Sequence, residues 1–419
     1  MTPLRSSIGS PPSVTFIEQI AAYQSRIGHL MFMAATGILV AGSLARFAAA
    51  DEYDTLNVVV GGSVTHDSNL FRSTDSAGPR SDTIKAGYVG LRIDKPYAQQ
   101  RFQADVTETA SRYEKFSYLN FDAFSYRGAW LWHLSPRVSG TLSADRTESL
   151  SPFEEALSRQ RNLRISENRV FNLDAWISGG WHGLLGVSQS KQTSEQAFQA
   201  VPDFRSVSEE AGVRYIALSG SSVSVTRRSI QGHYLNSAFV PVSVNNDSYG
   251  QDESELMASW ILSGRSTMTG RLTWIERHND NFTQGNFSGL AGELGYGWVP
   301  ANELHLDFLA KRSISPYYDV SSTYRVDNSL AFAPSWQVSG KITARARLEY
   351  VQSYFSGGVA VPNVPARNDT ARNVLLGVDW APLRGVTVGA SLQRQRHTSN
   401  VIFYGYDDTI ASVNASLMF

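Results

Sequence analysis

The stretch ITARARLEY, Ile342 to Tyr350, alternates between apolar and charged side chains. A period of two places the two sets on opposite faces of a β-strand. A soluble sandwich would turn the charges toward water, and a membrane barrel would turn them toward a wet interior. The apolar set is Ala344, Ala346, Leu348 and Tyr350, and the charged set is Arg345, Arg347 and Glu349.

The same unit recurs from Asp51 almost to the last residue, as segments of roughly ten alternating residues between turns rich in Gly, Ser, Pro and Asn. Short connections alternate with longer ones, as in outer-membrane barrels. We therefore predict an all-β fold, a transmembrane antiparallel β-barrel of about 18 strands (16–18). The short turns are Pro96–Gln100, Ser135–Arg137, Ser178–His182, Ser219–Ser222, Ser263–Ser266, Val299–Glu303, Ser335–Gly340 and Pro382–Gly385.

The two faces are not perfectly sorted. Glu108 and Arg396 fall on the apolar face, toward strand ends, where a membrane face becomes less apolar. Phe153 to Arg161 is compatible with a short helix or a solvated loop. Tryptophans gather where strands meet the short turns, as an interfacial girdle would. They are Trp130, Trp132, Trp176, Trp260, Trp298, Trp336 and Trp380.

The two ends of the chain carry export signals. An apolar run, Leu30 to Leu44, precedes the small residues Ala48 to Ala50, which predicts a signal peptide over residues 1–50 and a single barrel over 51–419. An N-terminal anchor helix is the alternative. The terminal NASLMF, ending at Phe419, resembles the assembly signal of bacterial outer-membrane barrels. That resemblance implies the bacterial outer membrane as location and the barrel-assembly machinery and outer-membrane lipid as partners.

The composition favours no enzyme class. A formal net charge of −1 provides no field for nucleic acid, and the absence of cysteine excludes disulfides and thiol chemistry. The eight histidines lack metal-ligand spacing, and neither a G-x-S-x-G elbow nor a phosphate-binding glycine loop occurs. We predict no cofactor and no catalytic role, although a Ser/His pair that meets only in space stays open.

Strand parity instead selects a set of charged residues that point into the lumen. One interpretation is that they pair across strands and stiffen the wall; the other is that unpaired arginines form a path for anionic groups. The predicted inward arginines are Arg92, Arg101, Arg127, Arg164, Arg214, Arg271, Arg325, Arg345 and Arg347. The predicted inward acids are Asp105, Asp145, Glu293, Asp307, Asp327, Glu349 and Asp379.

One short motif follows the first predicted strand. Asp67, Ser68, Asn69, Leu70, Phe71 and Arg72 spell DSNLFR. As local chemistry, DSN is also an ordinary Asx-type turn. The motif resembles one of outer-membrane β-barrels that accompany exosortase-type gene clusters for extracellular polysaccharide. This resemblance implies an exporter of an extracellular polysaccharide, with periplasmic and inner-membrane synthesis and export components as partners. The exporter would be similar in outline to alginate export porins, which have Arg-rich bores.

Three alternatives to export stay open: a diffusion porin for small solutes, a structural or adhesive surface barrel, and a soluble secreted β-protein. Ser353 to Ala366 would serve a porin as an inward constricting loop. Aromatic loop residues either stack on sugar rings or pack the loops onto the barrel. These residues are Tyr317, Tyr318, Tyr354, Phe355 and Tyr404.

Overall fold

The computed structural model describes residues 55–156, 159–196, 201–235, 248–281, 283–318, 322–358 and 366–419. The predicted signal peptide, residues 1–50, lies outside these ranges. Eighteen strands form one antiparallel sheet. They are β1 (Leu56–Asp67), β2 (Asp82–Tyr97), β3 (Gln100–Tyr113), β4 (Phe121–Ser135), β5 (Val138–Leu150), β6 (Leu163–Ser178), β7 (Trp181–Ser194), β8 (Phe204–Ile216), β9 (Ser222–Tyr234), β10 (Ser248–Ser263), β11 (Ser266–Asn279), β12 (Phe287–Ala301), β13 (Leu304–Pro316), β14 (Ser322–Ser339), β15 (Ile342–Gly357), β16 (Asn368–Trp380), β17 (Val386–Ser399) and β18 (Tyr406–Met418).

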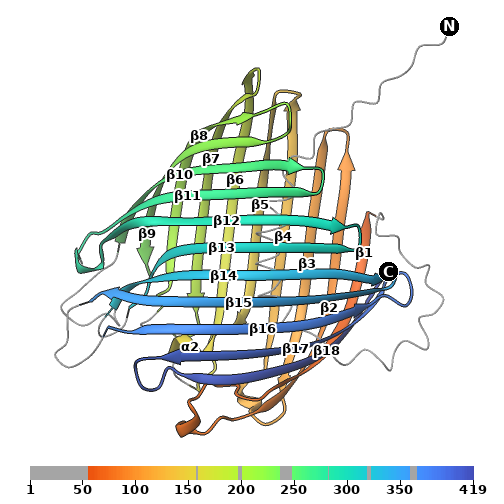
Figure 1. Cartoon of the computed structure of the whole chain (residues 1–419), viewed down its shortest axis with the longest axis vertical. Coiled ribbons are helices and arrows are strands. Elements are labelled where there is room, and N and C mark those ends of the chain that lie inside the picture. Colours follow the sequence, from red (N-terminus) through yellow and green to blue (C-terminus); the bar gives the residue numbers. More distant parts are fainter. Residues whose placement is uncertain are drawn as a thin grey trace.

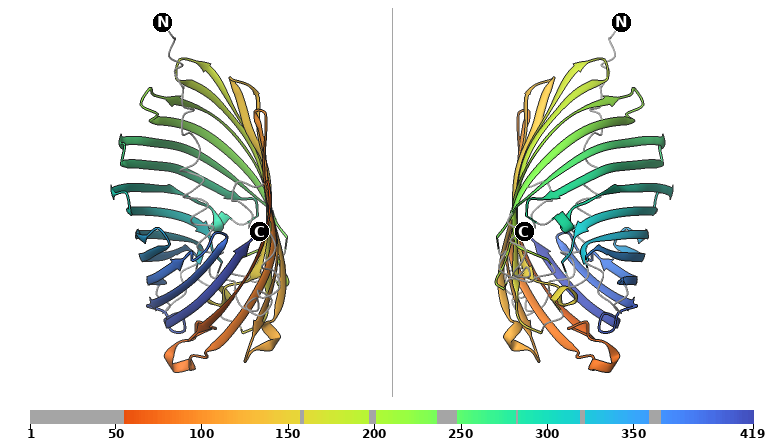
Figure 2. Two further views of the ribbon diagram at one scale, coloured as in Figure 1. Left: turned by 90° about the vertical axis from the view of Figure 1, so that its right-hand side faces the viewer. Right: turned by 90° about the vertical axis from the view of Figure 1, so that its left-hand side faces the viewer.

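The sheet closes on itself. Each strand pairs with its sequence neighbours, and β1 also pairs with β18, from Val59 opposite Met418 to Asp67 opposite Ile410. In Figure 1 the strands of the near wall cross those of the far wall at a steep angle, and Figure 2 shows the same oblique course from two sides. Tilted strands are what closure of a barrel requires. The predicted 18-stranded barrel is therefore confirmed.

The connections sort as predicted. All eight expected short turns join strand pairs at one end of the barrel, and the longer loops lie at the other end. Helical structure in the described ranges is limited to single turns, among them α2 (Phe153–Ala156), η1 (Asp75–Ala77), η2 (Ser117–Leu119) and η4 (Thr283–Gly285). None of these helices is long and apolar enough to cross a membrane.

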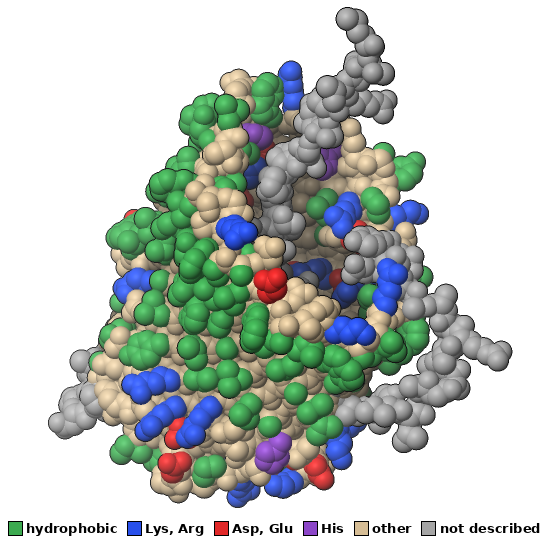
Figure 3. Space-filling model, turned by 45° about the vertical axis from the view of Figure 1, so that its right-hand side comes forward, with side chains coloured by type: hydrophobic (Ala, Val, Ile, Leu, Met, Phe, Trp, Pro, Cys, Tyr) green, Lys and Arg blue, Asp and Glu red, His purple; other side chains and the backbone are tan. Residues whose placement is uncertain are grey.

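The opening stretch has the two faces that its alternation predicts. Leu348 and Tyr350 are 46 % and 40 % exposed on the outside of β15, and Arg345 and Arg347 lie on the opposite face in ion pairs. Figure 3 shows the resulting belt of hydrophobic side chains on the outer wall. A closed barrel with an apolar outer belt satisfies every backbone group inside hydrocarbon and is the architecture of bacterial outer-membrane proteins. The chain is such a barrel, and the bacterial outer membrane is its location.

The aromatic girdle is present with one exception. Trp260, Trp336 and Trp380 are about half exposed near the short turns, but Trp132 is only 5 % exposed. Its ring stacks on Phe171 at a centroid distance of 6.0 Å and covers Gly140, where a Cβ would come within 2.4 Å of the indole. The glycine opposite Trp132 therefore seats the indole against the sheet, which strand parity alone does not predict.

Candidate functional site

The lumen wall carries ion pairs between strands and along single strands. Seven of the nine predicted inward arginines contact a carboxylate. The pairs are Arg92–Asp105 (2.9 Å), Arg101–Asp94 (2.6 Å), Arg214–Asp174, Arg271–Glu255 (3.8 Å), Arg325–Asp327 (2.9 Å), Arg345–Asp379 (2.7 Å) and Arg347–Glu349 (2.8 Å). Arg164 also has an interaction partner. The geometry favours the wall-stiffening interpretation for most of the set.

Arg127 is different from the other predicted arginines. It stands in register between Asp105 and Asp145 on the two adjacent strands. Asp105 instead contacts Arg92, and Asp145 accepts a hydrogen bond from Asn168 at 3.0 Å. Among the described residues Arg127 has no ion-pair or hydrogen-bond partner. It is the predicted arginine best placed to offer a free positive charge to the bore.

The remaining predicted acids have weaker contacts. Glu293 lies in register between Arg271 and Lys311 without an ion pair within 4.0 Å in the described ranges. Asp307 is exposed and lies between Gly297 and Ala333. Neither forms a site with a second predicted residue.

Sequence reasoning missed a charge cluster on β8, β9 and β10. Arg228 donates to Glu210 at 2.7 Å and to Glu253 at 2.9 Å. The three residues are direct cross-strand neighbours. Strand parity places Glu253 on the inner face. The consecutive acids Asp252 and Glu253 put one charge on each face of β10, so the alternation is not visible in the sequence there.

The long-loop end of the bore is lined by arginines sandwiched between rings. The Arg367 guanidinium lies 4.1 Å from the Phe355 ring and 3.4 Å from the Tyr404 ring, and it binds Asp369 at 2.5 Å. Burial opposes its charge, but the hydrogen bonds to Asp369 and the electrostatic attraction of Tyr317, Asp369 and Tyr404 together outweigh burial and raise the pKa of Arg367. Arg277 lies over Tyr249 in the same way at 3.4 Å.

These contacts decide the role of the loop aromatics. Tyr317, Tyr318 and Phe355 are buried, and the Tyr318 hydroxyl lies 2.9 Å from that of Tyr234. Of the two alternatives, sugar stacking does not apply to these three rings, because they are buried against protein. Tyr354 is exposed on the lipid-facing side of β15. The packing alternative therefore holds at this rim.

The proposed constricting segment is also revised. Ser353 to Gly357 belong to β15 and pair with β14 and β16. The expectation of a loop from Ser353 is wrong over this part, because pairing with β14 continues the strand to Gly357. Residues 359–365 lie outside the described ranges.

The DSNLFR motif forms a latch across the seam between the first and last strands. Arg72 contacts Asp67 at 3.0 Å and Asp408 at 3.1 Å. The Ser68 hydroxyl and the Asn69 amide both donate to Asp408, at 2.9 and 3.0 Å. Asp408 lies near the start of β18, so these bonds join strands that are more than three hundred residues apart.

The turn inside this latch is tight. Arg72 has a φ of 53°, a left-handed conformation that is rare for a side chain larger than glycine. Its guanidinium also donates to the Asn69 carbonyl at 2.6 Å. Burial opposes the charge of Arg72, but Asp67 and Asp408 outweigh that effect and raise its pKa. The predicted Asx-type turn is present, because the Asn69 amide also donates to Asp67 at 2.9 Å.

The apolar half of the motif anchors the neighbouring loops. Leu70 and Phe71 are buried in a cluster with Leu119 and Phe153 from the next two long loops. Phe71 packs edge-on against Phe116 at 4.8 Å and against Phe153 at 4.9 Å. The motif therefore supports one side of the barrel mouth.

Phe419 holds the other end of the same seam. Its backbone exchanges two hydrogen bonds with Val58 of β1, at 3.0 and 2.9 Å. The seam is thus secured at the short-turn end by the terminal residue and at the long-loop end by the latch. The role of Phe419 in assembly stays a prediction.

The described residues contain no cluster of His, Asp and Glu arranged to hold a metal ion.

Comparison with known proteins yields fold neighbours and no family. No protein-family model matches the chain, and no curated protein matches it. OccK2 (OpdF) of Pseudomonas aeruginosa, solved in complex with glucuronate, is 11 % identical with a TM-score of 0.49, over 89 % of this chain and 100 % of that one. OpdK of the same organism, solved with vanillate, is 11 % identical with a TM-score of 0.48, over 87 % and 98 %. A BenF-like porin from Pseudomonas fluorescens Pf-5 is 10 % identical with a TM-score of 0.49, over 88 % and 99 %. At these identities and TM-scores, the overlap assigns no substrate to this chain.

Proposed function

We propose that the protein is an aqueous channel through which small polar solutes cross the outer membrane. The observation that supports this proposal most strongly is the set of ion pairs on the inner face. Their side chains are partly exposed, for example Arg92 at 54 % and Asp105 at 51 %, which fits a bore that water reaches. An 18-stranded barrel is wide enough to enclose one.

The pairing also bears on selectivity. A carboxylate beside almost every predicted arginine offers both signs of charge to a passing ion at short range. Selective anion pores require rings of like charge instead. We therefore expect weak ion selectivity, with Arg127 as the main local bias toward anions.

Export of an extracellular polysaccharide is the second candidate. It rests on the resemblance of Asp67–Arg72 to barrels of exosortase-type clusters and on the width of the barrel. In the structure the motif serves the seam and the mouth, so its presence is explained without a substrate. The enzyme alternative has no supporting site in the described residues.

Planar-bilayer recording of the refolded mature chain tests the channel. We expect stepwise conductance with a reversal potential near zero in a salt gradient. Replacing Arg345→Glu and Arg347→Glu together turns two ion pairs into two groups of carboxylates, so the reversal potential should move toward cation preference. Silent bilayers would refute the channel, and an unchanged reversal potential would remove these residues from the conduction path.

Solute size separates the two candidates. In liposome swelling, a porin for small solutes should admit monosaccharides and slow steeply with oligosaccharide length. Deletion of the gene followed by assay of surface polysaccharide tests export directly. Normal polysaccharide on the deletion strain would eliminate the exporter, and its loss together with swelling by long oligosaccharides would replace our first proposal.

A further inference from the structure

The outer wall of β16, β17 and β18 carries three arginines that face the membrane side. Arg372, Arg394 and Arg396 share strand parity with Leu376 and Leu392, which are 53 % and 50 % exposed on the outside. Arg372 is the direct cross-strand neighbour of Arg396. All three lie toward the long-loop ends of their strands, which face the cell exterior.

These arginines are poorly neutralised. Arg396 approaches Asp407 only at 3.9 Å, and both side chains are exposed. Arg372 and Arg394 have neither an ion-pair nor a hydrogen-bond partner in the part of the chain that the structure describes. Since arginine keeps its charge at any working pH, three guanidinium groups face one carboxylate on this outer surface.

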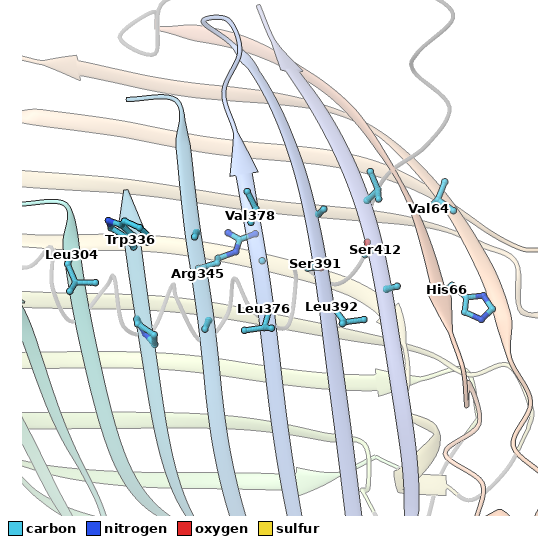
Figure 4. A pocket seen from close by; sticks show the side chains of 17 residues that line it. Val64, His66, Leu304, Trp336, Arg345, Leu376, Val378, Ser391, Leu392 and Ser412 are labelled. Atoms are coloured by element: carbon cyan, nitrogen blue, oxygen red, sulfur yellow. The ribbon is translucent and has the colours of Figure 1, made fainter. Parts of the chain in front are cut away.

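An apolar depression lies beside them on the outer wall and extends over β13–β18 and β1. Figure 4 shows it, with Trp336, Leu376 and Leu392 among the side chains around it, and its volume is about 1000 Å³. The small side chains of Ala390 and Ala411 create the space. Leu392 is two residues from Arg394, and Leu376 is four from Arg372, which is about 7–13 Å along a strand.

A second depression on the outer wall makes the contrast. It lies over β10–β15, has a volume of about 730 Å³ and has Leu272, Leu290 and Leu330 among its lining residues. Arg312 lies at its edge, but its guanidinium donates to the Leu290 carbonyl at 3.1 Å and to Asn328 at 2.8 Å. Free arginines therefore adjoin an apolar depression on β16–β18, and the arginine at the depression on β10–β15 is hydrogen-bonded.

We propose that the outer face of β16–β18 is a binding site for a phosphorylated, multiply acylated glycolipid of the outer leaflet. The planar guanidinium groups of Arg372, Arg394 and Arg396 bind phosphate oxygens through charge-assisted hydrogen bonds. The acyl chains of the same lipid fill the depression around Ala390 and Ala411. This arrangement puts the charged headgroup nearest the exterior and the acyl chains toward the bilayer centre. A lipid of the outer leaflet has the same orientation.

The experiment is rebinding of defined lipids to delipidated full-length barrel in detergent, followed by native mass spectrometry. The probes are bis-phosphorylated lipid A, mono-phosphorylated lipid A and phosphatidylglycerol. The wild type should bind the bis-phosphorylated form most tightly. The triple variant R372Q/R394Q/R396Q should lose affinity for it on the order of tenfold or more, and the single variant R312Q should bind like the wild type.

A second variant tests the apolar half without touching the arginines. Ala390→Phe fills the depression and should weaken lipid A binding while the barrel keeps its heat-modifiable gel migration. Equal binding by the wild type and the triple variant would overturn the proposal. So would equal affinity of the wild type for phosphatidylglycerol and lipid A, because that would mean nonselective contact with surrounding lipid.

Discussion

Arginine–carboxylate contacts at the seam and in the bore have the same chemistry in different surroundings. At the seam, Arg72 is 14 % exposed and its partner Asp408 is fully buried. In the bore, Arg92 and Asp105 are both about half exposed. A buried charge that loses its partner is costly, and an exposed pair contributes little to stability. The seam contacts therefore hold the barrel closed, and the bore contacts set its electrostatics.

The largest effect is expected from the apolar side of the seam latch. Phe71→Ala removes a ring packed between two others and should cost about 3–5 kcal/mol in the free energy of unfolding. Urea titration followed by heat-modifiable gel migration measures this loss. The matched control is Phe403→Ala, because Phe403 is a loop phenylalanine with 66 % exposure. Equal losses in the two variants would show that Phe71 does not anchor the mouth.

The charged side of the latch should come next. Asp408→Ala leaves Arg72 with one partner and leaves the Ser68 and Asn69 donors short of an acceptor. We expect a loss of about 3 kcal/mol, because a buried ion pair is broken from one side. The same urea titration checks it. A variant as stable as the wild type would mean that the seam is held by backbone pairing alone.

The smallest effect on stability is expected in the bore. Asp105→Ala removes an exposed partner of Arg92 and should cost less than about 1 kcal/mol. It also leaves Arg92 without its partner, beside the already unpaired Arg127, so the reversal potential should move toward anion preference. A large stability loss without change in selectivity would break the distinction between seam and bore.

Sequence alone predicted the faces of the strands, and it did so because parity and loop length are local properties. The short turns, the strand number and the inward position of Arg345 and Arg347 followed from them. The ion-pair partner of each arginine could not be predicted in this way. Arg345 pairs with Asp379 on the next strand, and Arg347 pairs with Glu349 on its own strand, because register and side-chain reach decide between neighbours on one face.

Contacts across the seam were also hidden from sequence reasoning. The Asx-type turn at Asp67–Asn69 is local and was predictable, but its partner Asp408 becomes a neighbour only when the ring closes. The patch on β16–β18 was visible only as Arg396 on an apolar face. Its meaning depends on Arg372 lying opposite Arg396, which is set by the register of the β16–β17 hairpin and not by parity alone.

The central claim is that hydrocarbon surrounds the barrel and water fills its bore. Its most direct test uses the lack of cysteine in the chain, because any introduced cysteine is then the single reactive thiol. Single cysteines at positions 345 to 349 of β15 are exposed to a membrane-impermeant, water-soluble thiol reagent in reconstituted vesicles. Labelling should alternate, with Arg345→Cys, Arg347→Cys and Glu349→Cys reacting and Ala346→Cys and Leu348→Cys protected. Uniform labelling of all five positions would contradict a barrel wall with lipid on one face and a bore on the other.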